Sequence, residues 1–389
     1  MKVNIFVSIG HYFKNLPKKN WFQSLITSLA CAAVGIVIGF IVLLCINPQN
    51  AGSGILQTIQ NFFVFSSTTN RLKYFGQTLA KASALMMTGL SIAFAYKAGL
   101  FNIGASGQYM IGVLCTLYAS LAWRLPWIIC ILLAILGGAL YGSLVGLLKA
   151  YFNVNEVISG IMFNWIGLYI VNALLQLNTN IWDFSIARSN QVRSDTISFL
   201  PNIRLDKIFG GNEVVGIGII IAILVAIVIY IILNKTTLGY EIKATGFNRH
   251  AAKYAGMKQK RNIVLILAIA GGLSGLAAPL YYLNGFAHWS LSSVVDPMGF
   301  NGISAAFLGG LNPIGIIFSS YFIMHITDGG STITDLGYSP ETAKVITASI
   351  IYLCAFVAFV KERINRKVNP IKIILDDDVT RSVEGGQKA

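Results

Sequence analysis

The sequence predicts an all-α, polytopic integral membrane protein with about eight to ten transmembrane helices. Of its 389 residues, 55% are hydrophobic and only 11% are charged, and the mean hydropathy is +0.67. Soluble domains usually carry about 25% charged residues. A helix needs about 20 consecutive apolar residues to cross a bilayer. Such runs recur along the whole chain and leave no room for a large soluble domain.

Nine apolar runs make up the predicted membrane domain. The first is too long for the core of a secretory signal and has no small-residue cleavage site, so we expect it to be retained as a span. Residues 22–360 then form the transmembrane domain, between a cytoplasmic N-terminal segment, 1–21, and a cytoplasmic tail, 361–389. The runs cover residues 22–46, 79–96, 103–123, 126–148, 157–177, 214–233, 263–283, 302–326 and 343–360.

The distribution of basic residues predicts the orientation in the membrane. Four lysines and no acidic residue precede the first run, five basic residues lie within the 12 positions after the last run, and loop 235–262 holds seven basic residues against Glu241 alone. Because Lys- and Arg-rich loops stay in the cytoplasm, we expect both termini and this loop to be cytoplasmic. The charge-balanced stretch 178–213 then lies outside. This pattern accounts for the net charge of +14 without a nucleic-acid partner.

The eighth run predicts a broken or re-entrant element. Nine complete spans cannot return both termini to the same side, so one run must be interrupted. Run 302–326 carries Gly309, Gly310, Pro313 and Gly315 at its middle, a combination that interrupts a helix. Such backbone is tolerated at membrane depth only where protein or water satisfies it. A re-entrant hairpin here restores the parity.

A second interruption is predicted at residues 98–108, AGLFNIGASGQ, between two strong apolar runs. It contains Gly99, Gly104 and Gly107 together with Asn102 and Gln108. The stretch is either a tight cytoplasmic turn or an unwound segment inside the membrane. Its glycines are equally consistent with close contacts between packed helices.

Titratable residues are almost absent from the apolar runs. Lys81, Lys97 and Glu156 stand near run ends, where each side chain can reach an interface, and the five cysteines show no paired metal-ligand spacing. An ion-coupled transporter normally buries a titratable group or an ion site near the midplane. The chain also has no phosphate loop and no nucleophile–base constellation of an enzyme. If ATP drives this protein, another subunit must bind it.

Loop 235–262 is too long for a simple connector and mixes alanines with fixed charges. A short amphipathic helix here presents an apolar face made of Ala251, Ala252, Tyr254, Ala255 and Met257. Solvent does not favour such a face, so a groove on a partner protein is expected to cover it. The alternative is an interfacial helix that lies on anionic lipid.

Four segments resemble parts of a known protein family and occur in the same order along the chain, which makes them more specific than any single motif. The loop sequence GFNRHAAKYAGM resembles the coupling helix of permease subunits of ABC importers. GLFNIGASGQYMIG, NEVISGIMFNWI with the following LYIVNALLQ, and GFNGISAAFLGGLNPIGI resemble the nucleoside and simple-sugar branch of that family. Together they extend over most of residues 79–360.

The resemblance implies a permease subunit that translocates nucleosides by alternating access in a bacterial cell membrane. It implies separate ATPase subunits that hold ATP and magnesium, a second and related permease in a heterodimer, and an extracytoplasmic substrate-binding lipoprotein. This chain itself then binds no cofactor and is not an enzyme. The first alternative is a simple-sugar permease of the same family. The second, of a different class, is an ion-coupled secondary transporter or channel.

Two sets of residues are the candidate functional sites. The first set docks on the ATPase: Gly246, Asn248, Ala251, Ala252, Ala255, Gly256 and Met257. The second set lines the substrate pathway, where amides can bind ribose hydroxyls and an aromatic ring can stack on a base: Asn102, Gln108, Asn164, Trp165, Asn301 and Ser304. For each residue of the second set, the alternative is a hydrogen bond between helices or an interfacial anchor.

Overall fold

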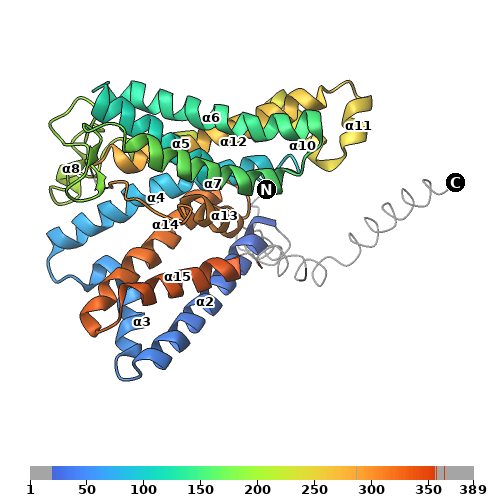
Figure 1. The fold of residues 1–389 in the computed structure, drawn as a ribbon. Coiled ribbons are helices and arrows are strands. Elements are labelled where there is room, and N and C mark those ends of the chain that lie inside the picture. The colour runs from blue at the N-terminus through green and yellow to red at the C-terminus, as the bar shows by residue number, and fades with distance from the viewer. Residues whose placement is uncertain (1–19, 286, 355, 357–362, 364–389) are drawn as a thin grey trace, which may run out of the picture.

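The computed structural model describes residues 20–285, 287–354, 356 and 363, and these are almost entirely helical (Figure 1). The predicted terminal segments 1–21 and 361–389 lie outside the described residues, except for positions 20, 21 and 363. The α-helices are α2 (Asn20–Ile46), α3 (Ala51–Gln60), α4 (Thr68–Tyr96), α5 (Ala105–Leu117), α6 (Trp127–Phe152), α7 (Glu156–Leu175), α8 (Leu205–Ile208), α9 (Gly218–Lys235), α10 (Thr237–Phe247), α11 (Arg249–Tyr254), α12 (Gln259–Tyr282), α13 (Met298–Leu308), α14 (Pro313–Ser331) and α15 (Pro340–Cys354).

Short elements complete the fold. Two 3-10 turns, η2 (Asn61–Val64) and η4 (Thr332–Leu336), follow α3 and α14, and a π-helical turn, η3 (Tyr118–Ala122), extends α5. Strands β1 (Trp182–Asp183) and β2 (Arg188–Ser189) pair antiparallel.

Five helices among the described residues are long and apolar enough to cross a membrane: α4, α6, α7, α9 and α12. Residues 30–46 of α2 and the short helix α13 are apolar as well. The prediction of an all-α, polytopic membrane protein is confirmed.

The helical bundle has two distinct ends (Figure 1). Helices α10 and α11, which come from the basic loop, lie at one end, called here the coupling end. The charge-balanced stretch 178–213, with β1, β2 and α8, lies at the opposite end, called here the distal end. The two loops that the charge pattern assigns to opposite sides of a membrane are therefore at opposite ends of the bundle.

Glycines bring the central helices into backbone contact. Helix α12 packs against α4, α5 and α6. A Cβ atom added to Gly112 of α5 would lie 2.6 Å from the carbonyl oxygen of Gly275 in α12, and one added to Gly142 of α6 would lie 3.0 Å from Cα of Gly271. Lipid provides no hydrophobic driving force between helices, so close packing through small residues holds such a bundle together.

The break predicted in run 302–326 is confirmed. Helix α13 ends at Leu308, Gly310 and Leu311 adopt positive φ angles of 65° and 55°, and α14 begins at Pro313. The Asn312 side chain caps the new helix by accepting a hydrogen bond from the Ile314 N–H at 3.0 Å. The two arms are unequal, because α13 has 11 residues and α14 has 19.

The stretch 98–108 contains the turn that joins α4 to α5, with Gly99 at φ 67°. Its glycines also make close contacts: a Cβ at Gly99 would lie 3.2 Å from the carbonyl oxygen of Gly246 in α10, and one at Gly104 would lie 3.4 Å from Cα of Gly160 in α7. The turn therefore lies at the coupling end and packs directly against the basic loop.

The helix predicted to begin at Leu79 begins 11 residues earlier, at Thr68. Its first turns contain Arg71 and Lys73, which lower the local hydropathy. Tertiary contacts stabilise them: the rings of Phe65 and Tyr74 stack with centroids 4.2 Å apart, and Gly76 packs on Phe209.

Candidate functional site

Two of the predicted pathway residues form a closed hydrogen-bond network beside the turn between α4 and α5. Asn102 donates to Gln108 Oε1 at 2.8 Å and to Ser91 Oγ at 2.9 Å, and Gln108 donates back to Asn102 Oδ1 at 3.0 Å. All three side chains are buried. Their hydrogen bonds are made within the chain, and they fix the path of the turn.

Asn164 of α7 holds the first turn of α5. Its Oδ1 accepts from the Gly107 N–H at 2.7 Å, and its Nδ2 donates to the Ile103 carbonyl at 2.9 Å. The first N–H groups of a helix have no partner within the helix, so Asn164 satisfies one of them from a neighbouring helix.

The structure does not gather the remaining pathway candidates into one site. Trp165 lies on an exposed face of α7, where its ring stacks with Tyr169 at a centroid distance of 6.3 Å. Asn301 is partly exposed on α13, and Ser304, three residues further along the same helix, is buried.

The beginning of α13 meets the beginning of α5 in the middle of the bundle. The backbone of Gly299 packs directly on Ser106, and the Met298 carbonyl accepts a hydrogen bond from Thr88 Oγ1 at 3.2 Å. Thr88 lies 8 residues before the end of α4 at Tyr96, which corresponds to about 12 Å along the helix. Helix α13 therefore begins well inside the bundle and runs toward the coupling end, where Phe307 contacts Tyr96 with ring centroids 5.5 Å apart.

A carboxylate that the sequence analysis did not consider lies just before α13. Asp296 accepts a hydrogen bond from the Met298 N–H at 2.8 Å. Asp296 is outside the apolar runs, so a search of the runs alone misses it.

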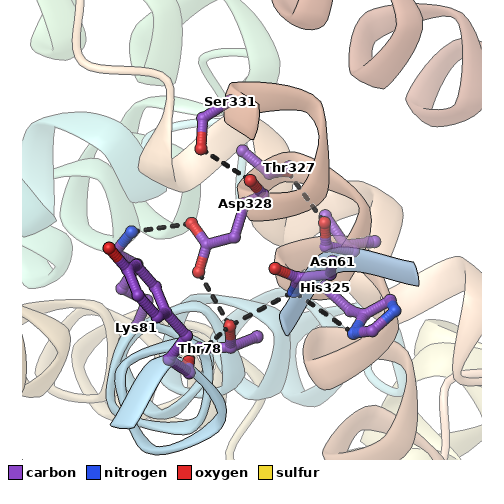
Figure 2. Close-up of polar contacts among 9 residues, drawn as sticks. Asn61, Thr78, Lys81, His325, Thr327, Asp328 and Ser331 are labelled. Carbon is purple, nitrogen blue, oxygen red and sulfur yellow. Dashed lines mark hydrogen bonds and ion pairs between the residues drawn. The ribbon is translucent and has the colours of Figure 1, made fainter. Parts of the chain in front are cut away.

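A second polar cluster joins α4 to α14 (Figure 2). Lys81 Nζ lies 2.6 Å from Asp328 Oδ1, and Thr78 donates to Asp328 Oδ2 at 2.9 Å. Asn61 of η2 donates to Thr78 Oγ1 at 3.4 Å and lies 3.3 Å from Nδ1 of His325. The cluster connects η2 and α4, which are adjacent in the sequence, to α14, where Asp328 lies 250 positions after Thr78.

Lys81 and Glu156, which were expected to reach an interface, each form an ion pair with a charged side chain of another helix. The Lys81 side chain is only 19% exposed and Asp328 only 15%. Glu156 pairs with Lys149 of α6 at 2.8 Å, and both side chains are 13% exposed. Charges taken out of water need an opposite charge close by, and the tertiary fold supplies one to each residue.

The basic loop folds into two helices at the coupling end. Asn248 lies between them, and its side chain caps α11 by accepting from the Ala251 N–H at 3.0 Å. Gly246 approaches the turn after α4 closely, because a Cβ there would lie 2.7 Å from the Lys97 carbonyl oxygen. Gly256, at φ 81°, ends the helical segment, and Met257 after it is partly buried.

The exposed surface of this loop differs from the predicted face. Ala252 is only 3% exposed and packs against its own chain, whereas Ala251 and Ala255 point outward. The largest exposed groups are Phe247, at 95%, and Tyr254, at 94%. Tyr254 belongs to the predicted face, but Phe247 was missed, although an aromatic residue in a basic loop is itself a signal of a covered surface.

Among the described residues, no three His, Cys, Asp or Glu side chains come together as metal ligands would. The polar groups instead form small hydrogen-bond networks between helices. The basic loop at the coupling end exposes two aromatic side chains, Phe247 and Tyr254. These features define an all-α, polytopic membrane protein with a structured loop at one end of its bundle.

Comparison with known proteins assigns the family. The family model described as branched-chain amino acid transport system / permease component matches residues 74–355. The chain belongs to this family of transport permeases, whose members are transporter subunits and not enzymes. No solved structure matches the chain significantly.

Curated relatives cover nearly the whole chain. The nucleoside ABC transporter permease protein NupB of Lactococcus lactis is 33% identical over 363 residues, which is 91% of this chain and 96% of the relative. The guanosine ABC transporter permease protein NupP of Bacillus subtilis is 29% identical over 88% of this chain and 97% of its own length. The glucose ABC transporter permease protein TsgB13 of Haloferax volcanii is 26% identical over 86% of this chain and 87% of its own length.

Proposed function

We propose that this chain is the membrane-spanning permease subunit of an ATP-driven importer of nucleosides in a bacterial cell membrane. The observation that carries the proposal is the similarity to two permeases whose names specify nucleosides and guanosine, over nearly the full length of all three chains. Simple sugars are the second candidate substrate, because relatives named for glucose and D-allose also match.

The partner ATPase binds at the coupling end, with both chain termini on the same, cytoplasmic side. Phe247, Ala251, Tyr254 and Ala255 are exposed there, on and just after α10 and α11. Aromatic side chains at the centre of an interface provide much of its binding energy. Gly246 connects this surface to the turn before α5, since the two backbones are in contact. ATP and magnesium are held by that partner, and a movement of the loop is passed directly to the transmembrane helices.

The pore is a heterodimer with a second, related permease. In Lactococcus lactis and in Bacillus subtilis, a second permease with the same kind of name, NupC and NupQ, also matches this chain, with 27% and 25% identity. Each of these two organisms therefore has two different permeases that match this chain, as expected if two different permease subunits form one pore. An extracytoplasmic substrate-binding lipoprotein delivers the substrate to the distal end.

The docking surface is tested by removing its two exposed aromatic rings. The double variant Phe247→Ala/Tyr254→Ala is expected to lose co-purification of the ATPase subunit and its substrate-stimulated hydrolysis, because the rings make the contact. Phe184→Ala removes an exposed ring at the distal end and serves as the matched control. A double variant that retains the ATPase as well as the control does would refute this docking surface.

The substrate class is tested by competition. In vesicles that contain the complete complex, uptake of labelled guanosine should fall when other nucleosides are added and stay unchanged with glucose or D-allose. Competition by the sugars alone would favour the second candidate.

A further inference from the structure

A non-helical segment crosses about half of the bundle between α12 and α13. At the distal end, Trp289 Nε1 donates to Asn172 Oδ1 at 2.9 Å, and Asn172 Nδ2 donates to the Ser292 carbonyl at 2.9 Å. Asn172 lies three residues before the end of α7 at Leu175. Six residues after Ser292, Met298 contacts Thr88 in the second half of α4. The chain therefore descends from the distal end to the interior without a helix.

The outer face of this segment is exposed. Leu291, Ser292, Ser293 and Val294 are all exposed, Val294 to 71%, and so is Pro297. Non-helical backbone cannot face lipid at membrane depth, because its N–H and C=O groups have no partners there. It is tolerated only where it is covered by protein or lines a water-filled cavity. The face that carries these residues is therefore not a lipid face.

Asp296 lies in this segment and forms no ion pair within the described part of the chain. Its carboxylate accepts one hydrogen bond, from the Met298 N–H. No Lys, Arg or His among the described residues forms an ion pair with it, in contrast to Asp328 and Glu156. The side chain is partly exposed. An unpaired carboxylate inside a membrane domain is costly and marks a functional position by default.

A second unsatisfied group lies at the inner end of the segment. The hydroxyl of Ser106 is completely buried, has no hydrogen-bond partner in the described part of the chain, and packs on Gly299. Burying a polar group without a partner destabilises the fold. Two polar groups without sufficient partners, one on each side of Met298, indicate that this route receives a polar ligand.

We propose that the segment from Ser292 to Asn301 is the substrate-contacting wall of the translocation pathway, and that the Asp296 carboxylate accepts hydrogen bonds from the vicinal hydroxyls of a ribose. The inference rests on the proposed function and extends it to a site. An ionised carboxylate has four acceptor positions on two oxygens, and only one of them is used by the Met298 N–H. Phe300, exposed on the first turn of α13, offers a ring for the base.

The ligand class follows from the donors and acceptors present. The free acceptor positions of Asp296 need donors, and a nucleoside or sugar supplies them as hydroxyl groups. The amide of Asn301, partly exposed and next to Phe300 in the first turn of α13, can serve as donor or acceptor for the same ligand. A ligand without vicinal hydroxyls leaves the carboxylate unsatisfied and is disfavoured.

The test compares Asp296→Asn with wild type in the complete complex, which includes the ATPase, the second permease and the binding protein, reconstituted in vesicles. The probes are guanosine and 2′,3′-dideoxyguanosine, each at a concentration that saturates the binding protein. Wild type should prefer guanosine. The variant should lose about tenfold in guanosine uptake, since hydrogen bonds to a charged acceptor are lost, while uptake of the dideoxy analogue should not fall.

Asp195→Asn, at an exposed carboxylate of the distal loop paired with Arg193, is the matched control and should behave as wild type. An equal loss for both probes, or an unchanged preference for guanosine, would overturn the assignment of Asp296. A wild-type complex that transports neither probe would contradict the proposed function itself, so the two failures are distinguishable.

Discussion

Replacing Gly112 by alanine tests the close packing that holds α5 against α12. The added Cβ would lie 2.6 Å from the carbonyl oxygen and 2.8 Å from Cα of Gly275, whereas ordinary contact begins at 3.4 Å. Both neighbours are backbone atoms, so no side chain can turn away. The two helices must separate locally by about 0.8 Å, which is the difference between contact at 3.4 Å and the 2.6 Å available.

Overpacking of this kind costs about 1–3 kcal/mol. Alanine returns up to about 1 kcal/mol, because it is a better helix former than glycine. Subtracting this gain in full leaves a net loss of up to about 2 kcal/mol, equivalent to as much as a 30-fold smaller ratio of folded to unfolded protein. Gly52→Ala in α3 is the matched control, since a Cβ there has no atom within 4 Å.

The assay is the temperature at which half of the detergent-solubilised protein is lost from its size-exclusion peak. Gly112→Ala should lower that midpoint, and Gly52→Ala should leave it unchanged or raise it slightly. A midpoint for Gly112→Ala as high as that of the control Gly52→Ala would refute the close approach of α5 and α12.

Three further substitutions test the polar contacts and the loop. Lys81→Met leaves Asp328 without its cation and should lower the free energy of unfolding by about 2 kcal/mol, which is below the 3–5 kcal/mol of a fully buried pair. Exchanging the two residues should restore part of this loss. Both effects are read from the same thermal midpoint. Asn164→Ala removes the acceptor of the buried Gly107 N–H and should cost about 1–3 kcal/mol, measured in the same way. Gly246→Ala places a Cβ 2.7 Å from the Lys97 carbonyl oxygen and should reduce substrate-stimulated ATP hydrolysis more than the thermal midpoint, which an ATPase assay in nanodiscs compares directly.

The membrane architecture and its main interruption could be predicted from the sequence because both are local properties. Long apolar runs determine the spans, and the cluster from Gly309 to Pro313 determines the break between α13 and α14. The earlier start of α4 was not predictable in this way. Its first turns are polar, and packing against Phe65 and Phe209 stabilises them.

The pairing of charged groups needed the tertiary fold. Lys81 and Asp328 are 247 positions apart, and no local pattern predicts that they meet. Asp296 was missed for a related reason. It follows an apolar run, and the inward path of its segment depends on the contact of Trp289 with Asn172.

The polar residues inside the apolar stretches could be found in the sequence, but the sequence alone could not decide between a substrate contact and a hydrogen bond between helices. Asn102, Gln108 and Asn164 are conspicuous in the sequence because amides are rare among apolar residues. An amide that binds a ligand and one that joins two helices look the same in a sequence, since both need a donor and an acceptor. The structure shows that these three make their hydrogen bonds within the chain.

The dependence of nucleoside uptake on a separate ATPase is the most direct test of the central proposal. The complete complex is reconstituted in vesicles without an ion gradient, and uptake of labelled guanosine is measured with MgATP and the binding protein. Uptake against the guanosine gradient should require ATP and should be lost when the phosphate-loop lysine of the ATPase subunit is replaced by alanine. Accumulation by vesicles that contain this chain alone, driven by an imposed proton gradient, would contradict the account.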